Sequence, residues 1–213
     1  MNRQASGRRA FLLGGTGIAA LGLLRPGHAL AELLATPTQT AGPFYPTAFP
    51  VDADNNLVDV RGAARPAEGQ VTHIMGRVLT TGGEPVPGAR VEIWQCDARG
   101  IYLHPRSDRA HRRDPGFQGY GRAVADGSGG YAFRTIRPVA YAGRTPHIHV
   151  GVQSAAGDLV TQMFVAGEPG NDRDFLYRGL DPRARAAVTV QLAPAVEIEA
   201  GALAGRFDIV LQG

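Results

Sequence analysis

Residues 141–152 read YAGRTPHIHVGV, and the rest of the chain is organised around this stretch. The alternation of His147, Ile148 and His149, followed by further apolar residues, is typical of a β-strand. Side chains two residues apart in a strand point to the same face, so His147 and His149 are expected to project together. Two imidazoles side by side suit a transition metal such as iron, copper or zinc. The spacing alone does not separate a metal site from two ordinary core histidines.

Short apolar runs separated by turn residues occur along the whole chain. The 213 residues include 29 Gly and 15 Pro, a composition that favours frequent turns over long helices. Strands are predicted at 70–79, 90–97, 131–135, 147–153, 159–165, 187–192 and 206–211. This pattern predicts an all-β fold, an antiparallel β-sandwich with long irregular loops and no substantial helical domain. The irregular stretch 104–122 is longer than an ordinary connection, which favours a functional loop.

Residues 1–31 have the features of an export signal. Arg8 and Arg9 precede an apolar run that is too short to span a bilayer comfortably, and 29–31 (Ala-Leu-Ala) offers a cleavage site. The phrase GRRAFLL resembles a twin-arginine signal, whose pathway carries folded proteins. The segment therefore predicts an exported protein, periplasmic or extracellular. An ordinary Sec signal or an uncleaved anchor is the alternative.

The rest of the chain divides into an arm and one domain. Residues 32–69 form an extended N-terminal arm centred on TAGPFYP at 40–46, where two prolines around two aromatic residues disfavour a helix. Such an arm could cap a hydrophobic surface or line a pocket. Residues 70–213 are predicted to form the β-sandwich domain.

The charge distribution limits the partners. All 22 basic residues are arginines, and those of the signal segment account for the net charge of +3, since the remaining chain is slightly acidic. No basic patch indicates nucleic acid, and no stable membrane association is expected after signal removal. The single cysteine, Cys96, excludes an internal disulfide and reads as a buried, inert thiol. The sequence does not determine the oligomeric state, and it is compatible with a homo-oligomer.

Three phrases now identify a family. They are VEIWQCDARGIYLHP at 91–105, GYGRAVADGSGGYAFRTIRP at 119–138 and RTPHIHVGV at 144–152. They contain GxY, TIxPxxY and RxxHxH in that order. Over roughly residues 38–211 the chain resembles the intradiol ring-cleavage dioxygenases, and within that family the protocatechuate 3,4-dioxygenases most closely.

The resemblance implies a mononuclear, non-haem Fe(III) cofactor. By position, its ligands would be Tyr102, Tyr141, His147 and His149. The family's substrate-activating arginine falls on Arg144, its pocket glutamine on Gln162, and the ligand that the substrate displaces on Tyr141. The arm residues expected to line the substrate pocket are Gly42, Pro43, Phe44 and Tyr45.

The implied reaction is cleavage of a catecholic ring by O2 to a cis,cis-muconate-type dicarboxylic acid. The ligand chemistry agrees, because two phenolates are hard anionic donors that favour Fe(III). A phenol with a pKa near 10 becomes a ligand only when a strong Lewis acid displaces its proton. The link between Tyr141 and Arg144 is only Ala142-Gly143, shorter than in protocatechuate enzymes. We therefore expect protocatechuate not to be strongly preferred over neutral catechols.

Two other functions fit parts of the sequence. A non-catalytic transthyretin-like binding module would explain the turn phrase DGSGGYAF at 126–133, but not the ordered set of ligand residues. A zinc or copper site built on His147 and His149 alone would explain only the histidines.

The signal segment generates one prediction. Replacing Arg8 and Arg9 together by lysine should retain the precursor in the cytoplasm, because the twin-arginine pathway reads the arginine pair. Fractionation and immunoblotting of the tagged protein measure the outcome. Undisturbed export of the double variant would indicate the Sec route instead.

Overall fold

The computed structural model describes residues 32–141 and 143–212. The predicted signal segment 1–31 lies outside the described residues, so the export route stays a prediction. Two sheets of five strands each make up the fold. The strands are β1 Val71–Thr80, β2 Arg90–Trp94, β3 Tyr120–Val124, β4 Gly130–Ile136, β5 His147–Gln153, β6 Leu159–Val165, β7 Thr189–Val190, β8 Ala193–Pro194, β9 Leu203–Arg206 and β10 Ile209–Leu211. The short helices are η1 Ala110–Arg112, η2 Asn171–Arg173, α1 Phe175–Arg178 and α2 Pro182–Ala187.

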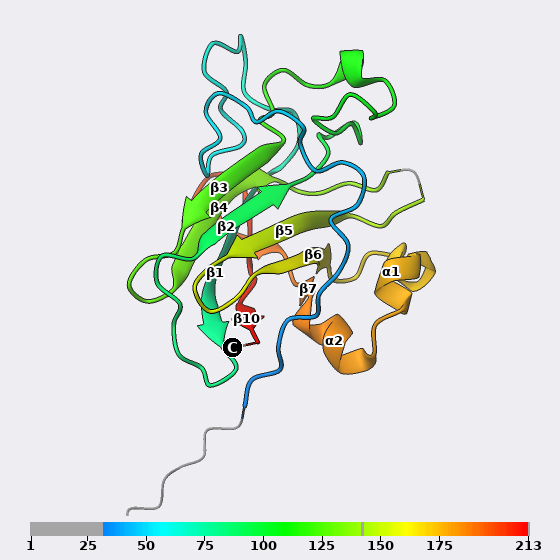
Figure 1. The fold of residues 1–213 in the computed structure, drawn as a ribbon. Coiled ribbons are helices and arrows are strands. Elements are labelled where there is room, and N and C mark those ends of the chain that lie inside the picture. Colours follow the sequence, from blue (N-terminus) through cyan, green and yellow to red (C-terminus); the bar gives the residue numbers. More distant parts are fainter. Residues whose placement is uncertain (1–31, 142, 213) are drawn as a thin grey trace, which may run out of the picture.

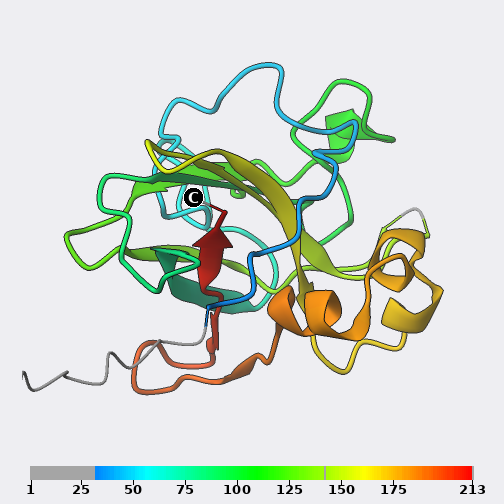
Figure 2. The same ribbon diagram turned by 60° about the horizontal axis from the view of Figure 1, so that its bottom comes forward.

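The first sheet has the order β10-β1-β9-β8, with β4 also paired to β1, and the second has the order β3-β2-β5-β6-β7. Figures 1 and 2 show the two sheets as separate layers. The all-β sandwich prediction is confirmed. The pairing is mixed rather than purely antiparallel, because β1 pairs in parallel with both β9 and β10, and β6 with β7.

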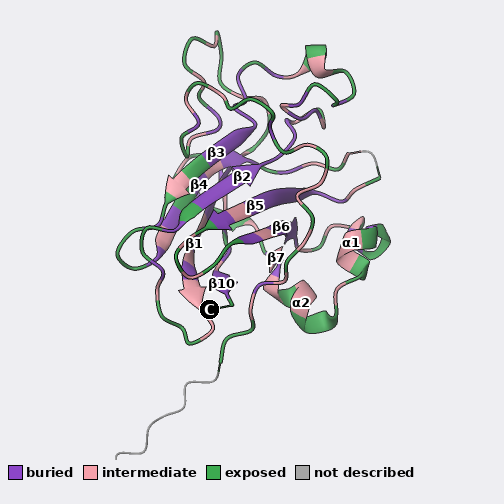
Figure 3. Ribbon diagram, in the orientation of Figure 1, coloured by how far each residue is buried: buried purple, intermediate pink, exposed green. Residues whose placement is uncertain are grey.

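The main core fills the space between the sheets. Strand β5 contributes Ile148, Val150 and Val152 to it, and β2 contributes Val91 and Ile93. These residues alternate with side chains on the outer face, as the two-residue period of a strand requires. Figure 3 shows the strands mostly buried, whereas the residues of both α-helices are exposed or intermediate. The second sheet therefore buries one face in the core and turns its other face away from it.

A second, smaller cluster covers that outer face. Its buried residues are Ala53, Trp94, Cys96, Tyr102 and Tyr120. The arm passes over β5 and β6 (Figure 1). The backbone N–H of Gln39 donates to the Val160 carbonyl at 2.8 Å and holds the arm there. Within the arm, residues 32–69 contribute a single isolated bridge, Asn56 with Arg134, and no strand or helix. The segment therefore lies over the outer face of the second sheet without regular secondary structure.

Several elements differ from the sequence prediction. Strand β3 begins within the last residues of the stretch expected to be irregular and continues beyond it, and the predicted strand 206–211 is divided between β9 and β10. Two helical turns, α1 and α2, were not expected; each begins after an aspartate whose side chain accepts two backbone N–H groups. None of the helices in the described ranges 32–141 and 143–212 is long and apolar enough to cross a membrane.

Candidate metal centre

Both histidines of β5 project from the outer face of the second sheet. The Nε2 atoms of His147 and His149 lie 3.3 Å apart, and each residue is 1 % exposed. The indole of Trp94, the β2 partner of His149, stacks on the His149 ring with 5.0 Å between centroids and 7° between planes. The strand alternation thus brings the two imidazoles together as the sequence predicted.

Hydrogen bonding and burial prepare these imidazoles for a metal. His147 Nδ1 lies 2.6 Å from the Thr145 carbonyl oxygen, which assigns the proton to Nδ1 and leaves the lone pair on Nε2. Burial, reinforced by the charge of Arg144, lowers the pKa of His147 to about 4. Burial and the neighbouring His147 also hold the pKa of His149 well below its usual value. Both rings are therefore neutral, which is the form that binds metals.

Two tyrosines complete the cluster. Tyr141 Oη lies 3.4 Å from His147 Nε2, and the Tyr102 ring lies edge-on to Tyr141 with 5.0 Å between centroids. Tyr102 is 1 % exposed, whereas Tyr141 is half-buried. Burial raises the pKa of both phenols, so each keeps its proton at neutral pH unless a strong Lewis acid displaces it.

The donor set fits a ferric ion. Within the described residues, the buried Tyr102 Oη has no hydrogen-bond partner. A buried polar atom without a partner is costly and calls for a missing ligand or water. No group of three or more His, Cys, Asp or Glu side chains in the described chain is arranged to hold a metal. The two histidines are accompanied by two phenols instead, and hard phenolate donors match Fe(III).

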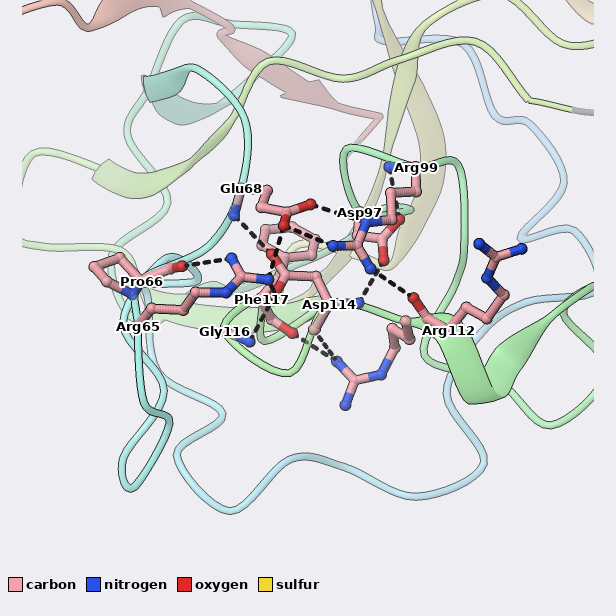
Figure 4. A network of polar contacts seen from close by, with 10 residues as sticks. Arg65, Pro66, Glu68, Asp97, Arg99, Arg112, Asp114, Gly116 and Phe117 are labelled. Atoms are coloured by element: carbon pink, nitrogen blue, oxygen red, sulfur yellow. Dashed lines mark hydrogen bonds and ion pairs between the residues drawn. The ribbon is translucent and has the colours of Figure 1, made fainter.

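A polar network fixes the loop that carries Tyr102 (Figure 4). The buried Asp97 carboxylate accepts the backbone N–H groups of Arg99, Ile101 and Asp114 at 2.9, 3.0 and 2.8 Å. Asp114 in turn accepts the Glu68 N–H at 2.6 Å, and Arg99 donates to both carboxylate oxygens of Glu68. The network ties the turn after β2 to the arm and so positions Tyr102. Sequence analysis assigned no role to Asp97 or Asp114.

Arg144 and Gln162 lie together beside the cluster. Arg144 Nη2 donates to Gln162 Oε1 at 2.7 Å, and Gln162 Nε2 donates to the Thr40 carbonyl of the arm at 3.0 Å. Gln162 faces His149 across the β5–β6 pair. The backbones of Tyr141 and Arg144 pair with each other, so the tight link between them places the phenol and the guanidinium at one site.

Asp174 also belongs to this group, although the sequence analysis missed it. Its Oδ2 accepts Arg144 Nε at 2.7 Å. Burial alone would raise the pKa of Asp174, but hydrogen bonds from Arg144 and from backbone amides lower it, so the carboxylate stays charged. An aspartate before an apolar run is an N-cap signal, and this signal in residues 171–176 could have located the helix. It could not have revealed the contact with Arg144.

The arm residues predicted to line the substrate pocket divide into two groups. Phe44 stacks on Tyr102 with 4.8 Å between centroids, and a Cβ on Gly42 would lie 3.4 Å from His149 Cε1. Tyr45 lies farther away, edge-on to Trp94, and its Oη donates to Glu92 at 2.9 Å. The Pro43 carbonyl accepts a hydrogen bond from Arg106. Gly42 and Phe44 thus touch the predicted ligands, whereas Tyr45 anchors the arm.

Two cavities, each of about 390 Å³, flank Tyr141. One is lined by Tyr102, Phe44 and Arg109, and the other by Arg144 and Arg173. Tyr141 lines both cavities, so it is the predicted ligand that a small molecule can reach from either side.

A β-sandwich that gathers two phenols and two neutral imidazoles beneath a covering arm presents a candidate site for a single metal ion. The family model described as "Dioxygenase" matches residues 40–213. The chain belongs to the intradiol ring-cleavage dioxygenase family, whose members are oxidoreductases.

Named relatives agree with this assignment. The chain is 39% identical over 152 residues to the protocatechuate 3,4-dioxygenase beta chain of Burkholderia cepacia, covering 66% of this chain and 63% of that one. The dioxygenase domain of a carbohydrate-binding fusion from Streptomyces sp. SirexAA-E aligns with a TM-score of 0.64 at 30% identity, covering 84% of this chain and 98% of that one. Catechol 1,2-dioxygenase from Acinetobacter sp. ADP1 gives 0.65 at 25% identity, covering 84% and 63%. The chain thus spans less than two thirds of the first curated relative.

The cluster generates a prediction about metal content. Tyr102→Phe and His149→Ala should each lose most of the iron that the parent protein binds, about one ferric ion per chain, because each removes a donor. Elemental analysis of the purified variants measures the loss. Tyr131→Phe is the matched control, since this buried tyrosine donates to the Phe207 carbonyl, away from the cluster. Full iron occupancy in both ligand variants would contradict the assignment.

Proposed function

We propose that this protein holds a ferric ion through Tyr102, Tyr141, His147 and His149 and cleaves a catecholic ring with O2. The bond between the two hydroxyl-bearing carbons breaks, and both atoms of O2 enter the product, a cis,cis-muconate-type dicarboxylic acid. The observation that carries the proposal is the convergence of two buried imidazoles and two phenols beside a fixed arginine. When bound, a ferric ion supplies the Lewis acidity that ionises the phenols and the catechol hydroxyls.

Each residue of the chain has a distinct task in this proposal. Tyr141 is half-buried and lines both cavities, so among the residues that would hold the ion its Oη is the one placed to meet a substrate and to receive a catechol proton. Arg144 holds a positive charge beside the site, where it stabilises negative charge that develops on the ring. Phe44 covers Tyr102 and excludes water, which strengthens that electrostatic effect.

Product analysis tests the reaction. The iron-loaded protein incubated with catechol under labelled dioxygen should give a muconate-type diacid that carries both labelled oxygen atoms, as read by NMR and mass spectrometry. Cleavage beside the two hydroxyls rather than between them would contradict the proposed chemistry. Unchanged catechol, with iron bound, would favour the transthyretin-like binding module.

The substrate is proposed to be a catechol without a strong requirement for a carboxylate. Two of the relatives named above and a hydroxyquinol 1,2-dioxygenase from Corynebacterium glutamicum are named for protocatechuate, catechol and hydroxyquinol, which all carry two adjacent hydroxyls. In the loop near the site, Arg106 donates to the Pro43 carbonyl and Arg113 to the Phe117 carbonyl. Arg109 lines the cavity beside Tyr102, with an acidic neighbour, Asp108, in the same wall.

The ratio of kcat/KM for protocatechuate and catechol tests this proposal. We expect a ratio below about 100, because Arg106 and Arg113 donate to backbone carbonyls and Arg109 has the acidic Asp108 beside it. A larger ratio would contradict the expectation. Arg109→Gln would then show whether Arg109 binds the carboxylate, with Arg112→Gln, an exposed residue of the same loop, as the matched control.

A further inference from the structure

Asp174 is a buried carboxylate between η2 and α1 whose two oxygens serve different parts of the molecule. The residue is 1 % exposed. Its Oδ1 accepts the N–H groups of Leu176 and Tyr177 at 3.0 and 3.1 Å and so caps α1. Its Oδ2 accepts Arg144 Nε at 2.7 Å and the Thr145 N–H at 3.0 Å. Oδ1 therefore caps the helix, and Oδ2 contacts Arg144 and Thr145 beside the candidate metal centre.

Helix capping alone does not explain an aspartate here. Asp181 caps α2 in the same manner, since its Oδ1 accepts the N–H groups of Arg183 and Ala184 at 2.8 and 2.9 Å. Asp181 is exposed and lies outside the metal centre. Asparagine caps a helix about as well as aspartate does. The charge of Asp174 is therefore unnecessary for the cap but matches the guanidinium of Arg144.

The Oδ2 contacts fix two groups of the centre at once. Arg144 is held at Nε by Asp174 and at Nη2 by Gln162, which leaves Nη1 without a hydrogen-bond partner among the described residues. The Arg144 side chain is 12 % exposed and lines a cavity with Tyr141. Thr145, whose N–H binds the same Oδ2, accepts the His147 Nδ1 hydrogen through its carbonyl. The same carboxylate oxygen thus accepts hydrogen bonds from the Arg144 guanidinium and from the Thr145 backbone N–H.

We propose that Asp174 is a positioning residue for ring cleavage: it holds the Arg144 guanidinium in the orientation that presents Nη1 to the substrate. The kinetic part of this inference rests on the proposed function. Asp174 touches neither the metal nor the substrate and acts through Arg144. Residues that act as one unit lose activity non-additively when both are changed.

A double-mutant cycle tests the kinetic part. Asp174→Asn should retain iron and the cap yet lower kcat for catechol by about 10–100-fold, with a smaller change in KM. Asp181→Asn, the matched cap variant, should keep the parent kcat. Adding Asp174→Asn to Arg144→Leu should cost less than a factor of about three beyond Arg144→Leu alone. Losses that multiply in the double variant, or a parent-like kcat in Asp174→Asn, would overturn the proposal.

A second measurement does not depend on activity. In NMR spectra of the full metal-free chain, the Arg144 Nε–H signal, assigned through Arg144→Leu, should be protected from solvent exchange and lose that protection in Asp174→Asn but not in Asp181→Asn. Protection that persists in Asp174→Asn would overturn the proposed orientation of Arg144. If the parent protein forms no ring-cleavage product, the proposed function fails, and this measurement alone decides whether Asp174 holds the guanidinium.

Discussion

The two-residue alternation of β5 is the constraint on which the site depends. Ile148, Val150 and Val152 are committed to the core between the sheets, so His147 and His149 must face the arm. A slip of one residue would turn the imidazoles into the core and the apolar side chains outward. The same register sets Trp94 and Gln162 on either side of His149. The packing that stabilises the sandwich therefore also fixes the positions of His147 and His149 in the candidate metal centre.

The candidate metal centre contains buried polar atoms without hydrogen bonds, which locally destabilise the fold. Tyr102 Oη, His149 Nδ1 and Trp94 Nε1 are three of the six buried side-chain atoms without hydrogen-bond partners in the described part of the chain. An unsatisfied phenol oxygen such as that of Tyr102 is expected where a ligand completes the structure. The hydrogen bonds of Asp97 and Asp114 and the contacts of the arm hold the cluster together, which offsets the cost of the unsatisfied polar atoms.

Sequence alone predicted the parts of the molecule that depend on local pattern. The alternation at 147–153 predicted the central strand. The resemblance to the dioxygenase family, carried by the ordered motifs, implied that Tyr102, Tyr141 and the two histidines share one site. Strand β3 was missed because Gly121 weakens its local signal; a Cβ there would lie 2.5 Å from the Asp54 carbonyl oxygen, a long-range contact. Asp174 was missed for a similar reason, since its partner Arg144 lies 30 residues away in the chain.

We propose that two tyrosines and two histidines hold a catalytic ferric ion that a catechol can reach. Anaerobic titration of the iron-loaded protein with catechol, followed in the visible spectrum, tests it most directly. We predict a burgundy protein whose tyrosinate-to-iron absorption changes saturably as catechol replaces Tyr141. The Tyr102→Phe variant should be colourless. A colourless iron-loaded protein, or a spectrum that catechol leaves unchanged, would contradict the account.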